Sequence, residues 1–140
     1  MKITSRFTVA VHALLAIHTF EQTEKTTSDF LAASVNVNPV VIRRILLSLK
    51  AAGMIEVKAG SGGARIVKNL NDITLYDVYR AVDSVDGGLF HFHESPNPNC
   101  PVGKNIHALL DRRLDAAQAA MENELRRTTL ADLAQELSEQ

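Results

Sequence analysis

A single cysteine and several histidines are the side chains whose types and spacing could form a reactive or metal-binding site. Cys100 lies in a segment rich in proline, asparagine and glycine, together with His91, His93 and His107. If a helix begins just after Cys100, its N-terminus would lower the pKa of the thiol, which could then act as a redox sensor. Alternatively, the cysteine and the histidines have the donor atoms that zinc or another divalent metal prefers. A small unreactive cysteine in a polar loop is the third interpretation.

The same segment contains the side-chain types of a Cys–His nucleophilic enzyme, with Glu94 as an additional carboxylate. Nothing in the sequence supplies oxyanion donors or a substrate cleft for that reaction. We therefore do not expect an enzyme.

The glycine-rich stretch AGSGGAR, residues 59–65, raises a different possibility, because such loops can cradle phosphates. A phosphate loop leads from a strand into a helix, whereas strand-like segments flank this stretch on both sides. The sequence also lacks the GK[ST] and GxGxxG patterns at this point. We predict the tip of a β-hairpin rather than a nucleotide site.

Composition favours one compact domain. The chain has 140 residues, of which 46% are hydrophobic, and this is enough to bury one core. No apolar run approaches the roughly 18 residues of a membrane span. A lone cysteine excludes an intramolecular disulfide and is typical of a reducing compartment. We expect a cytoplasmic protein with no membrane partner.

The net charge of −1 conceals a strong asymmetry. Residues 1–68 carry nine Lys/Arg and four Asp/Glu, a net charge of +5. The remaining residues carry six bases and twelve acids, a net charge of −6. Such a distribution is typical of a chain in which one part faces a polyanion.

The basic half has the pattern of three helices followed by a hairpin. Helical periodicity covers residues 5–20 and 28–36, and Asn38 before Pro39 is a strong start signal for a third helix that ends at Gly53. Alternating segments then surround the glycines, with Ile55, Val57 and Ala59 expected on one face. The predicted fold is mainly α with a small β-hairpin. It is a winged helix-turn-helix domain over residues 1–83, with its wing at residues 54–67.

The third helix has an outer face suited to DNA. Arg43 and Arg44 suit bidentate contacts with guanine, and Val40 suits a thymine methyl group. Other basic and small polar residues are placed to contact phosphates. The complete predicted DNA-binding set is Lys2, Arg6, Ser28, Asn38, Pro39, Val40, Arg43, Arg44, Leu47, Lys50, Lys58, Ser61, Gly62 and Arg65.

Four segments resemble the Rrf2 family of bacterial winged-helix transcription regulators, which includes IscR, NsrR and CymR. They are MKITSRFTVAVHALLAI, NPVVIRRILLSLKAAGMIEVKAGSGGARI, ITLYDVYRAVD and CPVGKNIHALLDRRL. The resemblance implies a homodimer that binds partly palindromic double-stranded DNA operators, with a long C-terminal helix crossing to the partner. Cluster-binding members use three cysteines where this chain has one, so no iron–sulfur cofactor is expected.

The C-terminal sequence supports a dimer independently of that resemblance. From about residue 105 to residue 127, apolar side chains recur every three or four positions on a helix too long for one small domain to cover. We expect part of this stripe to pack on the first helix and the rest to pair with a second copy. The chain thus divides into residues 1–83, a sensor loop at 84–104 and a dimerisation unit at 105–140. The predicted dimerisation residues are Ile106, Leu110, Leu114, Ala117, Met121 and Leu125.

These patterns together predict a sequence-specific DNA-binding regulator. A small dimer without a polymerase-contacting domain is expected to repress by occluding its promoter, and Cys100 would make it redox-responsive. A metal-responsive regulator, a Cys–His enzyme and a protein-interaction module that has kept a winged helix are the alternatives.

Overall fold

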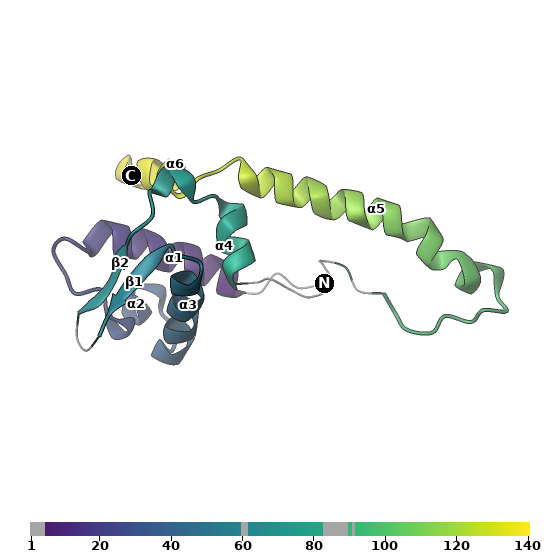
Figure 1. The fold of residues 1–140 in the computed structure, drawn as a ribbon, viewed down its shortest axis with the longest axis horizontal. Coiled ribbons are helices and arrows are strands. Elements are labelled where there is room, and N and C mark those ends of the chain that lie inside the picture. The colour runs from purple at the N-terminus through teal and green to yellow at the C-terminus, as the bar shows by residue number, and fades with distance from the viewer. Residues whose placement is uncertain (1–4, 60–61, 83–89, 91) are drawn as a thin grey trace.

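The computed structural model describes residues 5–59, 62–82, 90 and 92–140. In this part of the chain, a compact body of helices carries one hairpin, and a long helix extends away from the body (Figure 1). The predicted fold class, mainly helical with a small antiparallel hairpin in a winged helix-turn-helix arrangement, is confirmed. The elements are α1 (Ser5–Phe20), α2 (Ser28–Val35), α3 (Pro39–Ala51), β1 (Ile55–Lys58), β2 (Gly63–Ile66), the 3-10 turn η1 (Leu70–Asp72), α4 (Leu75–Val82), α5 (Pro101–Arg126) and α6 (Leu130–Ser138).

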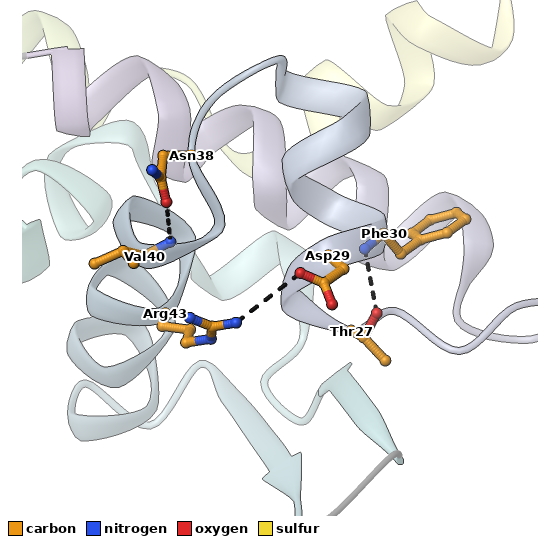
Figure 2. A network of polar contacts seen from close by, with 6 residues as sticks. All are labelled: Thr27, Asp29, Phe30, Asn38, Val40 and Arg43. Atoms are coloured by element: carbon orange, nitrogen blue, oxygen red, sulfur yellow. Dashed lines mark hydrogen bonds and ion pairs between the residues drawn. The ribbon is translucent and has the colours of Figure 1, made fainter.

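Side-chain caps determine where the two helices of the helix-turn-helix begin (Figure 2). The Thr27 hydroxyl accepts a hydrogen bond from the backbone N–H of Phe30 at 3.2 Å, and Asn38 Oδ1 accepts one from the N–H of Val40 at 2.9 Å. Asn36 ends α2 in the left-handed conformation, with φ of 64°. α2 and α3 consequently meet at 111°, within the usual range for a helix-turn-helix.

Helix α1 lies at the centre of the hydrophobic core. Its residues Leu14 and Ile17 are fully buried and pack with apolar residues from α2, α3, α4 and the base of the hairpin. On α3 the buried side chains are Ile42, Ile45, Leu46 and Leu49, as the helical spacing predicts. The core therefore fixes which face of α3 points outward.

The hairpin is anchored to the loop before α2. Two hydrogen bonds join Thr26 to Ala64. The buried Thr26 hydroxyl donates to the backbone carbonyl of Ala64, and the backbone N–H of Ala64 donates to the carbonyl of Thr26 at 2.9 Å. Gly63 makes this approach possible, since its φ is +78° and a Cβ would lie 2.8 Å from the Thr26 backbone. The strand face that holds Ile55 and Val57 is only partly buried, since Ile55 is 2% exposed and Val57 is 38% exposed. Only the base of a two-stranded hairpin reaches the body, so no layer covers Val57.

Helix α5 projects from the body, and its N-terminal end is the farther one (Figure 1). It begins at Pro101, directly after Cys100, because proline suits the first helical position and Cys100 adopts an extended N-cap conformation. Where α5 returns to the body, the guanidinium of Arg126 lies 3.8 Å from the ring centre of Tyr76 on α4. Among the described elements, α5 packs mainly on α4, and the packing of part of its stripe on α1 stays a prediction.

Helix α6 belongs to the core of the body. Leu130 is fully buried in the main hydrophobic cluster, and its N–H donates to the carbonyl of Ile73 at 2.8 Å. Thr129 and Asp132 form a capping box at the start of the helix. The predicted boundary between a sensor loop and a dimerisation unit at residue 105 stays a prediction. The structure adds that residues 130–138, assigned to the dimerisation unit, pack on the N-terminal body.

Among the described helices, none alone combines the length and the apolarity needed to cross a membrane. Taken together, α2 and α3 reach that length and composition, with the 111° bend between them.

Candidate nucleic-acid interface

The outer face of α3 presents four of the predicted DNA-contacting side chains in one row. Val40, Arg43, Arg44 and Leu47 follow the i, i+3, i+4, i+7 spacing that places residues on one side of a helix. All four are exposed, and Leu47 is 66% exposed although it is a large apolar residue. Neither arginine folds into the core, so both guanidinium groups are available to a partner on this face.

The cap residues of α3 have structural roles as well. Asn38 and Pro39 fix the first turn of the helix and therefore the position of Val40 in that turn. Asn38 is itself exposed at the N-terminus, where the helix dipole favours an anionic partner such as a phosphate.

An acidic side chain on α2 faces the arginines. Asp29 Oδ1 lies 3.9 Å from Arg43 Nη2, and Figure 2 shows Arg43 pointing from α3 toward it. Asp29 is 81% exposed and Arg43 is 58% exposed, so water screens this pair strongly. The contact orients the Arg43 side chain loosely and leaves it free to exchange partners.

The wing also has an arginine paired with a carboxylate, at a shorter distance than the Arg43–Asp29 pair. In the antiparallel register Glu56 lies opposite Arg65, and Arg65 Nη2 donates to Glu56 Oε2 at 2.8 Å. Both side chains are more than half exposed. Arg65, a predicted phosphate contact, therefore has a carboxylate partner of its own in the free protein.

A cavity of about 470 Å³ separates the wing from the end of α3 and the loop after α1. Lys50, Lys58 and Arg65 contribute to its lining, and so do three carboxylates, Glu21, Glu24 and Glu56. The charges on this side of the wing are thus mixed rather than uniformly basic. Gly62 lines the same cavity, and a Cβ on it would overlap the Lys58 side chain.

Glu21 also braces the wing directly, because its Oε2 accepts a hydrogen bond from the backbone N–H of Ile66 at 2.9 Å. Together with Thr26 it ties the hairpin to the helical body.

The remaining predicted phosphate contacts are dispersed. Arg6 is exposed near the start of α1, and Ser28, half-buried, is the first residue of α2. Lys2 and Ser61 lie outside the described residues. The geometry accordingly gathers the candidates into an α3 group and a wing group, with Arg6 at the start of α1 and Ser28 at the start of α2.

Cys100 is half-buried at the N-cap of α5. Its side chain makes no close capping hydrogen bond, yet the backbone N–H groups of Gly103 and then Val102 lower the pKa of the thiol below its ordinary value. Burial acts in the opposite direction and is the smaller influence. This agrees with the sequence-based hypothesis of a helix N-terminus beside the thiol.

The metal candidates are not brought together in the part of the chain that the structure describes. His107 stacks on the ring of Phe92 with 4.0 Å between ring centres, and His93 is exposed. No group of three or more His, Cys, Asp or Glu among the described residues could hold a metal ion. His91 lies outside the described residues.

The α5 stripe has no buried member among its residues. Ile106, Leu110, Leu114, Met121 and Leu125 are half-buried, and the sixth predicted residue, Ala117, is exposed. Part of the shielding comes from the segment before α5, since Phe90 and Leu114 line one small cavity. A helix of 26 residues, about 39 Å long, thus has an apolar side that the described residues cover only in part.

Sequence reasoning missed the acidic partners of the basic residues. Glu56 could have been found, because centring the hairpin on residues 60 and 61 places it opposite Arg65. Asp29 gives no comparable signal, since its approach to Arg43 depends on the angle between α2 and α3.

Comparison with known proteins gives one consistent family. Residues 3–136 match the Rrf2 family, described as an iron-dependent transcriptional regulator. A Bacillus subtilis protein, YwnA, described as a candidate HTH-type transcriptional regulator, is 47% identical over 131 residues, which cover 94% of this chain and 96% of YwnA. The family and this relative are regulators of transcription, which decides against an enzyme.

Solved structures agree with this assignment. The crystal structure of a candidate DNA-binding protein is 43% identical, with a TM-score of 0.72, and the match covers 92% of this chain and 98% of that one. A candidate transcriptional regulator from Lactobacillus plantarum is 29% identical, with a TM-score of 0.83, over 97% of this chain and 91% of that one.

Proposed function

Because the chain belongs to the Rrf2 family of transcriptional regulators, we propose that it is a homodimeric repressor that binds partly palindromic DNA operators through α3 and the wing. The observation that carries this proposal is the exposed row of Val40, Arg43, Arg44 and Leu47 on a helix whose other face is fully buried. A helix so oriented can enter a major groove, where guanidinium groups meet guanine and apolar side chains meet thymine methyl groups.

The wing supplies the second contact. Lys58 and Arg65 lie on its two strands, within reach of a phosphate backbone flanking the groove. Arg65 must exchange Glu56 for a phosphate when DNA binds, and the short hairpin is held in place for this by Thr26 and Glu21.

The dimer rests on α5. Its apolar stripe is only half-buried by the part of the chain that the structure describes, so a two-fold pairing of two α5 helices would cover the rest. Such a dimer would place two α3 helices on successive turns of one DNA face, as a palindromic operator requires. Occupation of a promoter by this small dimer would block polymerase.

We propose no resident cofactor, in spite of the iron in the family's description. The chain has one cysteine, and iron–sulfur clusters are held mainly by several thiolates. The described carboxylates and histidines do not converge on Cys100.

The lowered pKa of Cys100 favours a second role, in redox sensing. The thiolate would attack a peroxide, forming an S–O bond while the O–O bond breaks and hydroxide leaves as water. Oxidant should then weaken operator binding by the native protein and leave a Cys100→Ala variant unaffected. An equal loss in both proteins would eliminate the thiol role.

The affinity of the protein for duplex DNA, measured for the native chain and for two double variants, tests the principal proposal. The double variant Arg43→Ala/Arg44→Ala should bind duplex DNA at least about tenfold more weakly, since one base-contacting arginine contributes about 1–3 kcal/mol. Arg112→Ala/Arg113→Ala is the matched control, because it removes another pair of adjacent exposed arginines, from α5. Equal effects of the two double variants, or weak binding of every duplex by the native chain, would contradict the proposal.

A further inference from the structure

An apolar groove of about 550 Å³ lies along α1, outside both the α3 row and the wing. Its lining combines residues of α1, α2 and α6. Val11, Leu15 and Phe20 come from α1, and Leu137 comes from the last turn of α6. Both its volume and its predominantly apolar lining are within the range of small-molecule sites.

A polar pair interrupts the apolar lining. His12 Nε2, on α1, and Ser34 Oγ, at the end of α2, lie 3.0 Å apart in a hydrogen bond at the edge of the groove. Of the described residues that line the groove, His12 is the one ionisable side chain, and no carboxylate is among them. An imidazole can donate a hydrogen bond in any protonation state, and a serine hydroxyl can donate as well.

We propose that this groove binds a small amphipathic carboxylic acid as an effector of DNA binding. Its hydrocarbon part would lie on Val11, Leu15 and Leu137, and its carboxylate would accept hydrogen bonds from His12 and Ser34. The absence of acidic side chains from the described lining makes an anion the favoured head group, because no like charge opposes it. The assignment of the groove to an effector rests on the proposed function, whereas the binding site itself does not.

The groove is placed to influence the helix-turn-helix. Ser34 lies two residues before Asn36, which begins the turn into α3. Phe20, also in the lining, packs edge-on against Phe30 of α2 with 5.5 Å between ring centres. A ligand that takes over the His12–Ser34 hydrogen bond would therefore act on α2 and on the orientation of α3, and we expect it to lower operator affinity.

A second copy of the chain is the alternative occupant. The half-buried stripe on α5 offers a separate and much longer apolar surface, and the pairing of two α5 helices would already bury it. This is why we favour a small molecule.

Titration calorimetry with octanoate on the full-length protein tests the site without DNA. We expect saturable binding of octanoate, and binding of 1-octanol at least tenfold weaker, because the alcohol has no charged acceptor for His12. Thr19→Trp should reduce octanoate binding at least tenfold by filling the groove from an exposed position on α1. His12→Phe should do the same while keeping a similar ring. Gln22→Trp, an exposed position outside the groove, is the matched control and should bind like the native chain.

The effector role is tested next, by measuring duplex affinity with and without saturating octanoate. A several-fold loss in the native protein, absent from Thr19→Trp, supports it. If octanoate does not bind, or binds equally to Thr19→Trp and Gln22→Trp, this inference is wrong while the DNA-binding proposal stands. If octanoate binds only to a Leu114→Asp variant that has become monomeric, the groove belongs to a second copy, which also overturns the inference. If the ligand-free protein binds no duplex, the proposed function fails while the octanoate isotherm still decides whether the site exists.

Discussion

Removing the carboxylate of Glu56 should strengthen DNA binding. In the free protein Arg65 Nη2 donates to Glu56 Oε2 at 2.8 Å, and the two side chains are 67% and 61% exposed. Ion pairs with this exposure contribute about 0.2–1 kcal/mol. Arg65 gives up this interaction when it turns to a phosphate, so Glu56→Gln should raise duplex affinity about 1.4- to 5-fold, at about 1.4 kcal/mol per tenfold change.

The salt dependence supplies a second signature of the same change. A guanidinium released from Glu56 neutralises a phosphate more fully, and each neutralised phosphate steepens the plot of log affinity against log salt by about 0.9. Fluorescence anisotropy of a labelled duplex over a range of salt concentrations measures both the affinity and this slope. Because the pair is exposed, the thermal midpoint should change little.

Two matched variants make the test specific. Glu124→Gln breaks a similar exposed pair, with Arg127 at 3.2 Å, at the end of α5 far from the wing, and it should change neither affinity nor slope. Glu56→Gln should also give no gain when Arg65 is already glutamine. If Glu56→Gln binds DNA no more tightly than the native protein while remaining folded, Arg65 does not exchange Glu56 for a phosphate and its proposed contact with DNA is wrong.

Three further predictions concern the fold, the dimer and the thiol. Gly63→Ala should lower the free energy of unfolding by at least about 2 kcal/mol in urea denaturation, because φ is +78° and the Cβ would lie 2.8 Å from the Thr26 backbone. Gly53→Ala, with φ of +77° and no atom within 4 Å, should lose only about 1 kcal/mol, and equal losses would contradict the clash. Leu114→Asp should sediment as a monomer, whereas Ala119→Asp, on an exposed part of α5, should remain dimeric; a dimeric Leu114→Asp would exclude the stripe as the interface. The alkylation rate of Cys100 by iodoacetamide should rise with pH to a half-maximum below pH 9.0, since a lowered pKa keeps the thiolate at lower pH and the reactivity is lost as pH falls through that pKa. A half-maximum at or above that of a free cysteine in a short peptide, whose pKa is about 8.5, would remove the basis for the sensor role.

The local signals in the sequence were sufficient for the helix-turn-helix. Asn38 and Pro39 predict the start of α3 because a capping side chain before proline acts over three residues, independently of the rest of the chain. The four buried positions of α3 follow from helical spacing alone, and once they are assigned the exposed row that includes Arg43 and Arg44 follows too. The candidate site was predictable to this extent.

Features that depend on the relative placement of elements were not predictable in this way. Val57 has the alternation of a half-buried strand, but whether another layer covers it depends on the tertiary arrangement. The stripe on α5 shows that a face is apolar without showing what it packs on, and the contact of α5 with α4 was not predicted. The carboxylates beside Arg43 and Arg65 likewise emerge only when α2, α3 and the two strands are brought together.

Selection of bound duplexes from a random pool tests the central claim most directly. Two copies of α3, held at a fixed distance by α5, should enrich duplexes with two inverted half-sites whose centres are separated by one or more helical turns, about 10 base pairs each. The same selection with Arg43→Ala/Arg44→Ala should enrich nothing. Failure of the native protein to enrich any sequence, or an unchanged motif with the double variant, would contradict the account.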